Sequence, residues 1–182
     1  GIFLCRPREG QWFYQEGASR LFPEAWETYL DAIPKQERSD LVSAYYKRLT
    51  SENKKEQLNA AKAWSVWEAA TSSLIQNSER MTNYSTDDFA LAFARIECHY
   101  FINNIFMESP NYILESVQRI ADTPGQIVQG RYDVVCPPES AWELHKAWPR
   151  SQLHMIADAG HALSESGISA KLIEVMEQFK EL

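Results

Sequence analysis

Apolar and polar positions divide the chain into three stretches. The uninterrupted apolar run Ile2-Phe3-Leu4-Cys5 predicts a buried core strand over residues 1–6. From residue 7 to residue 122, apolar residues recur at steps of three and four, which is the spacing of amphipathic helices. From residue 123 to residue 182, short β-type runs alternate with helical segments. The pattern therefore predicts one strand, then an all-helical region, then a region of strands and helices.

Prolines and small polar residues mark the predicted helix starts. Pro23 and Pro34 each stand at the beginning of a predicted helix. The polar stretches 50–53 and 85–88 precede two more helices, and a fifth is predicted from about residue 112 to residue 120. Since no strand pattern interrupts these helices, the region is predicted to be all-helical.

The pattern changes at Thr123-Pro124-Gly125. Residues 126–129 and 153–156 form two β-type runs, with a helical segment at 138–148 between them and a final helix at about 168–179. Strand, helix, strand and helix joined by short links predict parallel pairing with a right-handed crossover. The fold class is therefore α/β, and the helical region is predicted to be an insertion between strands of one sheet.

Composition narrows the functional classes. Hydrophobic residues make up 45% and charged residues 24%, as in globular proteins. The charge of −7 and the lack of a basic run argue against nucleic acid as a partner. The apolar runs are far shorter than the roughly 20 residues that span a bilayer, so no membrane partner is expected. Three cysteines without paired spacing favour a reducing cytoplasm.

Candidate catalytic residues follow the two β-type runs. Asp133 ends the segment Gly130-Arg131-Tyr132-Asp133, and His161 ends Ala159-Gly160-His161. They are 28 residues apart, one strand-helix-strand repeat, so we expect them in adjacent loops at the carboxyl edge of the sheet. A histidine oriented by a carboxylate can take a proton from a serine hydroxyl. On position alone, solvated or capping loop residues remain the alternative.

The nucleophile of such a site is absent from the 182 residues. The nucleophile elbow G-x-S-x-G does not occur, because Leu21 and Lys171 stand two residues after Ser19 and Ser169. No two adjacent glycines are present to shape an oxyanion-hole loop. Since the chain begins with Gly1 and not with methionine, both elements are expected upstream, and the isolated chain is expected to be inactive.

Blocks spread over nearly the whole chain resemble the proline iminopeptidase family. They are Gly1-Ile2-Phe3-Leu4, Trp12 to Ala18, Trp64 to Glu68, Arg95-Ile96-Glu97, Gly130 to Asp133 and Gly160-His161. The resemblance implies the C-terminal part of an α/β-hydrolase parallel sheet with an inserted all-helical cap domain. It assigns 1–6 to a core strand, 7–122 to the cap and 123–182 to the core. It also implies a serine aminopeptidase, without metal or cofactor, that releases N-terminal proline from small peptides.

The resemblance assigns roles residue by residue. Asp133 and His161 match the triad acid and base, and the cap residues Glu68 and Glu97 match glutamates that recognise the charged amino terminus of the substrate. A prolyl ammonium loses hydration in a closed pocket, so carboxylates there offset that loss. The apolar slot for the pyrrolidine ring would be lined by Phe3, Phe13, Phe101 and Cys136. The alternatives are a solvated or salt-bridged helix face for the glutamates and ordinary core packing for the other four residues.

Other functions remain open from the residues themselves. An esterase or an epoxide hydrolase would share the fold and an apolar site under a helical cap. A non-catalytic helical binding module would explain the missing nucleophile. A metal enzyme is not predicted, because His99, His145 and His154 show no HExxH or comparable ligand spacing. The sequence makes no prediction of oligomeric state.

Overall fold

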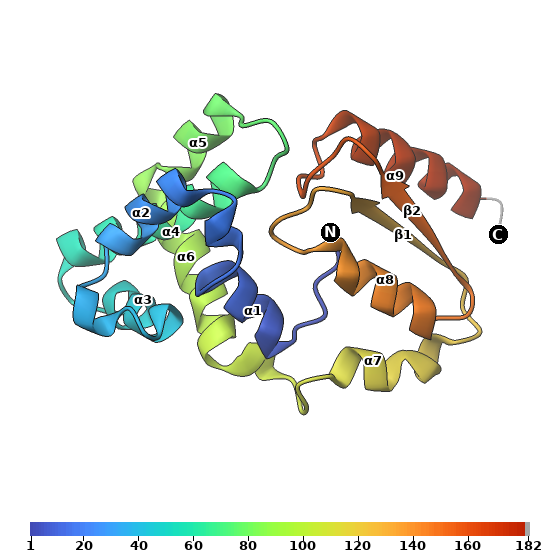
Figure 1. Cartoon of the computed structure of the whole chain (residues 1–182), viewed down its shortest axis with the longest axis horizontal. Helices are drawn as coiled ribbons and strands as arrows, with labels where there is room; N and C mark the ends of the chain where they lie inside the picture. The colour runs from blue at the N-terminus through green and yellow to red at the C-terminus, as the bar shows by residue number, and fades with distance from the viewer. Residues whose placement is uncertain (181–182) are drawn as a thin grey trace. The chain divides into compact units, whose positions relative to one another are not determined.

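The computed structural model describes residues 1–180, which form two compact units. The core unit contains Gly1–Leu4, Ser72–Ile75 and the chain from Asn111 onward, and the helical unit contains Cys5–Thr71 and Gln76–Pro110. Each unit has its own secondary structure, drawn in Figure 1.

The helical unit is built around its longest helix. Its helices are α1 (Pro7–Tyr14), α2 (Pro23–Asp31), α3 (Leu41–Leu49), α4 (Lys54–Thr71), α5 (Ser78–Tyr84) and α6 (Asp87–Ile102). Helix α4 contacts α2, α3, α5 and α6. Its Trp64 and Trp67 are almost fully buried, together with Tyr29 and Tyr45 of the neighbouring helices. The two tryptophans therefore mark the core face of α4.

Helix starts differ from the predicted ones in three places, at α1, Pro34 and α5, and α1 begins at Pro7, where no helix start was predicted. Pro34 does not begin an α-helix. It is followed only by the three-residue 3₁₀ turn Lys35–Glu37. Helix α3 begins at Leu41, where the Asp40 carboxylate accepts a hydrogen bond from the Ser43 backbone N–H at 3.1 Å. Helix α5 was not predicted, since its seven residues contain no buried side chain that would leave an apolar stripe.

The core unit contains a parallel pair of strands. Strand β1 (Gly125–Gly130) pairs with β2 (Ser151–Ile156) through the crossover helix α8 (Pro138–Ala147), and α9 (Ser166–Phe179) follows. Both helices pack against the strands, and Figure 1 shows them on either side of the sheet. Helix α7 (Tyr112–Ser116) and the 3₁₀ turn Val117–Ile120 precede β1. The predicted parallel pairing is confirmed.

The predicted strand over residues 1–6 is wrong. In the part of the chain that the structure describes, the sheet has only β1 and β2, and residues 1–6 carry no secondary structure. The backbone N–H of Ile2 donates to the side chain of Gln129, not to a strand backbone. Cys5 has φ +61°, a left-handed conformation that a strand running through residue 5 could not contain. An apolar run needs a neighbouring backbone to become a strand, and none is paired with it here.

The unit boundaries differ from the predicted domain boundaries. Cys5 and Arg6 belong to the helical unit, whereas 111–122 and Ser72–Ile75 belong to the core unit. The last two residues of the predicted range 123–182 lie outside the described residues. That the helical unit serves as a cap stays a prediction.

Candidate active site

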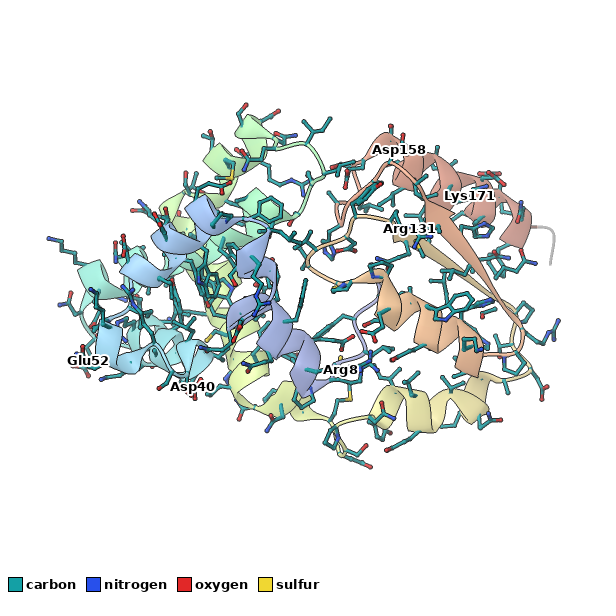
Figure 2. All side chains as sticks on the ribbon, viewed as in Figure 1. Arg8, Asp40, Glu52, Arg131, Asp158 and Lys171 are labelled. Carbon is teal, nitrogen blue, oxygen red and sulfur yellow. The ribbon has the colours of Figure 1, made fainter. Side chains whose placement is uncertain are left out.

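The loops that follow β1 and β2 run side by side. The backbone N–H of Arg131 donates to the carbonyl oxygen of Ile156 at 2.8 Å, and that of Tyr132 donates to the carbonyl oxygen of Ala159 at 2.9 Å. Gly130 allows this approach, because a Cβ there would lie 1.9 Å from the carbonyl oxygen of Gly160. Arg131, labelled in Figure 2, belongs to the first loop. The carboxyl ends of both strands therefore deliver their loops to one edge of the sheet.

Asp133 and His161 meet at this edge. The Nδ1 atom of His161 lies 3.1 Å from both carboxylate oxygens of Asp133. Asp133 is buried, with 3% of its surface exposed. Since an ionised carboxylate only accepts hydrogen bonds, this geometry places the ring proton on Nδ1 and leaves Nε2 able to accept a proton. The predicted juxtaposition of the two residues is confirmed, and their catalytic role stays a prediction.

Two further groups hold the Asp133 carboxylate. The backbone N–H of Cys136 donates to Oδ1 at 2.8 Å, and the side-chain amide of Gln129 donates to Oδ2 at 3.1 Å. Gln129 is fully buried, and its amide also donates to the Cys136 carbonyl at 3.0 Å. Sequence reasoning missed Gln129. The available signal was a glutamine directly after the apolar pair Ile127-Val128, at the carboxyl end of the predicted run 126–129.

The two predicted recognition glutamates meet an aromatic pair in the helical unit. Glu68 of α4 accepts a hydrogen bond from the Tyr14 hydroxyl, and Glu97 of α6 accepts one from the Trp64 indole N–H at 2.9 Å. The rings of Tyr14 and Trp64 are stacked, with centroids 4.3 Å apart. Each carboxyl is therefore held by one member of a stacked pair. Tyr14 belonged to the family resemblance, but its sequence position alone assigned it no role.

Burial changes the acidity of both carboxyls. It raises the pKa of Glu68 well above its usual range, and the neighbouring charge of Glu97 raises it further, while the Tyr14 hydrogen bond lowers it. Burial also raises the pKa of Glu97 to about 7, against the lowering effect of the Trp64 hydrogen bond. A fully solvated helix face does not fit Glu68, which is buried, while Glu97 is partly buried. Carboxyls in such surroundings favour a cationic ligand, which would stabilise their ionised forms.

We expect Glu97→Gln to stabilise the protein near pH 8 and to leave its stability near pH 5 almost unchanged. The folded-state pKa of Glu97 is raised to about 7, so its contribution to stability is present at low pH and is lost as pH rises through that value. Glutamine does not ionise, so the variant escapes a loss of about 2–3 kcal/mol. Urea unfolding at the two pH values measures this difference. Glu52→Gln, at an exposed position labelled in Figure 2, is the control. Equal effects of Glu97→Gln at both pH values would contradict the expectation.

The four predicted slot residues fall into both units. In the helical unit, Phe13 is buried and Phe101 is partly buried. Their ring centroids lie 4.8 Å and 4.7 Å from that of Tyr14. In the core unit, Phe3 is partly buried and Cys136 is buried. The structure brings Phe13 and Phe101 to one tyrosine, and it shows core packing for Phe13 against Trp67 at 5.4 Å. A slot for a pyrrolidine ring stays a prediction.

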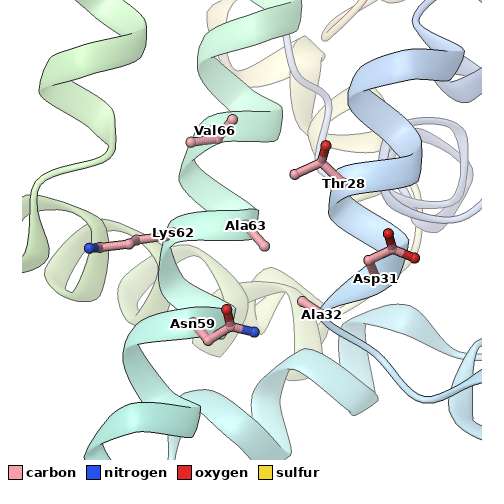
Figure 3. Close-up of a pocket in the computed structure, with 7 residues that line it drawn as sticks. All are labelled: Thr28, Asp31, Ala32, Asn59, Lys62, Ala63 and Val66. Atoms are coloured by element: carbon pink, nitrogen blue, oxygen red, sulfur yellow. The ribbon is translucent and has the colours of Figure 1, made fainter.

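A groove of about 350 Å³ in the helical unit contains none of the predicted site residues (Figure 3); its lining residues are Thr28, Asp31, Ala32, Asn59, Lys62, Ala63 and Val66. Within residues 1–180, no group of three or more His, Cys, Asp or Glu side chains is arranged to hold a metal ion. Across the same residues, no helix combines the length and apolar character that spanning a membrane requires.

Comparison with known proteins gives consistent matches. The family model described as alpha/beta hydrolase fold matches residues 15–167. A protein named probable proline iminopeptidase from Leptolyngbya boryana and a proline iminopeptidase from Xanthomonas citri are each 55% identical over 98% of this chain. A proline iminopeptidase from Arabidopsis thaliana is 50% identical over the entire chain. The chain covers 56%, 57% and 48% of these three proteins, so it spans about half the length of the curated relatives it matches.

Proposed function

Because the chain belongs to the α/β-hydrolase fold family, we propose that the protein containing it is a serine aminopeptidase that releases N-terminal proline from peptides. The observation that carries the proposal is 55% identity over 98% of the chain with proteins named proline iminopeptidase. The acid-histidine pair of the core unit supports it, as do the buried carboxyl of Glu68 and the partly buried carboxyl of Glu97 in the helical unit. Such a protein would work in the cytoplasm on small peptides.

In this proposal Asp133 and His161 serve as the acid and the base of a Ser-His-Asp triad. His161 Nε2 takes the proton of a serine hydroxyl as the oxygen attacks the prolyl carbonyl, and it then gives that proton to the leaving amine. Asp133 keeps the Nδ1 proton in place at 3.1 Å and stabilises the imidazolium that forms. The serine and the oxyanion donors lie outside this chain, since it contains no G-x-S-x-G segment.

Glu68 and Glu97 are proposed to bind the substrate's secondary ammonium. Their surroundings are dominated by aromatic rings, so an ionised pair is stabilised when a cation enters. A peptide whose amino group is blocked carries no such cation. Its binding therefore leaves the negative charge of the two carboxylates without a positive partner. Phe3, Phe13, Phe101 and Cys136 are proposed to line the slot for the pyrrolidine ring. Together these groups would restrict cleavage to the first residue of a peptide.

The test compares two amides with the complete protein. We expect cleavage of proline β-naphthylamide and not of its N-acetylated analogue. Glu97→Gln should lower kcat/KM for the free amine by about 10²-fold, because truncating one partner of a buried charge pair costs about 2–5 kcal/mol. Glu52→Gln, the same substitution at an exposed position, should leave kcat/KM unchanged.

Two outcomes would contradict the proposal. Equal cleavage of both amides would indicate a general hydrolase, such as an esterase or an epoxide hydrolase. No hydrolysis of any amide or ester by the complete protein would indicate a non-catalytic binding module.

A further inference from the structure

The side chain of Glu165 collects backbone donors on both sides of His161. Its Oε1 accepts hydrogen bonds from the N–H groups of Gly160 at 3.0 Å and Ala162 at 3.1 Å. Its Oε2 accepts from Gly160 at 3.1 Å and from Leu74 at 3.2 Å. One carboxylate therefore binds the residue before His161, the residue after it and a third segment of the core unit.

The position of Glu165 in its own helix does not explain this arrangement. Glu165 is the N-cap residue of α9, where a side chain ordinarily accepts a hydrogen bond from the first turn of its helix. Its side chain makes no such bond. It accepts instead from the backbone of the loop 160–162, which precedes it in the chain. Hydrogen bonds to a charged carboxylate are about twice as strong as those between neutral groups.

A second contact joins the same segments. The backbone N–H of His161 donates to the carbonyl of Ser72 at 3.0 Å, and Leu74 donates to the Glu165 side chain. The segment Ser72–Ile75 is therefore joined to the loop 160–162 directly at His161 and indirectly through Glu165. Gly160 makes the close approach possible, since a Cβ at this position would lie 2.9 Å from the Leu74 nitrogen and 3.2 Å from Glu165 Oε1. The backbone of the histidine loop is thus held by groups distant in sequence.

We propose that Glu165 is a positioning residue for His161. It fixes the backbone of residues 160–162, and the fixed backbone keeps the imidazole 3.1 Å from Asp133. Glu165 acts through His161 and contacts no reacting atom. The proposal rests on the proposed function only in taking His161 as the general base. A displacement of about 1 Å in such a group can cost about 10²-fold in rate.

The experiment compares Glu165→Ala and Glu165→Gln with the unaltered complete protein. We expect Glu165→Ala to lower kcat by about 10²-fold with KM nearly unchanged, since the binding groups are untouched. Glu165→Gln keeps one accepting oxygen, so its loss should be smaller. Glu177→Gln, at an exposed position of the same helix, should have no effect. Thermal unfolding gives the folded fraction of each variant, and kcat is calculated per folded molecule. A fall in kcat that remains after this correction comes from a displaced histidine and not from unfolded protein.

A spectroscopic measurement and an ester substrate complete the test. The downfield ¹H resonance of the His161 Nδ1–H should broaden or disappear in folded Glu165→Ala and persist in Glu177→Gln. Hydrolysis of p-nitrophenyl acetate reports the acid-histidine pair without any need for proline recognition. If the unaltered protein cleaves the ester but not the prolyl amide, the proposed function fails, while a loss of ester kcat in Glu165→Ala still supports the positioning role. If folded Glu165→Ala shows an unchanged kcat on the ester and an unchanged Nδ1–H resonance, the positioning role of Glu165 is overturned.

Discussion

We expect Asp133→Asn to lower kcat of the complete protein by about 10⁴-fold while KM changes little. The reason lies in the donors around the carboxylate. Cys136 N–H donates to one oxygen and the Gln129 amide to the other, and His161 Nδ1 lies 3.1 Å from both. An asparagine has only one accepting oxygen, so its NH₂ group must replace the oxygen that faces either the Cys136 N–H or the Gln129 amide, and in both cases it lies next to the imidazole. If it donates to Nδ1, the ring proton moves to Nε2, and the ring can no longer take a proton from a serine.

Steady-state kinetics on proline β-naphthylamide measure this effect. Asp158→Asn is the matched control, because Asp158 is exposed and follows β2, as labelled in Figure 2. It should retain full activity. A loss of less than tenfold in Asp133→Asn, with the protein folded, would show that Asp133 does not orient the base. A rise in KM without a fall in kcat would assign it to binding instead.

The second large effect is expected on stability. Trp64→Ala should lower the free energy of unfolding by about 3–5 kcal/mol. Trp64 is fully buried, stacks on Tyr14, and meets the Tyr45 ring edge-on with centroids 5.3 Å apart. Its removal leaves a cavity and deprives Glu97 of the donor at 2.9 Å. Since domains are stable by only about 5–15 kcal/mol, this change would remove a large share of the total.

Denaturant unfolding of the complete protein, followed by circular dichroism, measures the difference. Trp142→Ala is the control, because the same side chain on α8 is 54% exposed and should cost about 1 kcal/mol or less. Trp64→Phe should fall between the two, as it keeps most of the ring volume and loses the N–H. Equal stability of Trp64→Ala and Trp142→Ala would show that the aromatic core of the helical unit contributes little.

Local patterns determined a large part of the architecture. The steps of three and four residues predicted α2, α4 and α6, because a helix that packs on one face must repeat its apolar residues at that interval. The alternation of strand and helix after residue 123 predicted the parallel pair β1 and β2. It also predicted that Asp133 and His161 meet, since parallel strands end at one edge of the sheet.

Only the tertiary structure decided how the functional side chains are held. Glu68 accepts a hydrogen bond from the hydroxyl of Tyr14, 54 positions away in the chain. Glu165 accepts one from the backbone N–H of Leu74, 91 positions away. The segment predicted as a strand contacts Gln129 across 127 positions and has no strand partner. Residue periodicity reports which face of a local element is buried, and it carries no information on which distant group lies opposite that face. The sequence by itself therefore determined α2, α4, α6, the parallel pair β1 and β2, and the meeting of Asp133 with His161, while long-range packing decided which groups support these two residues.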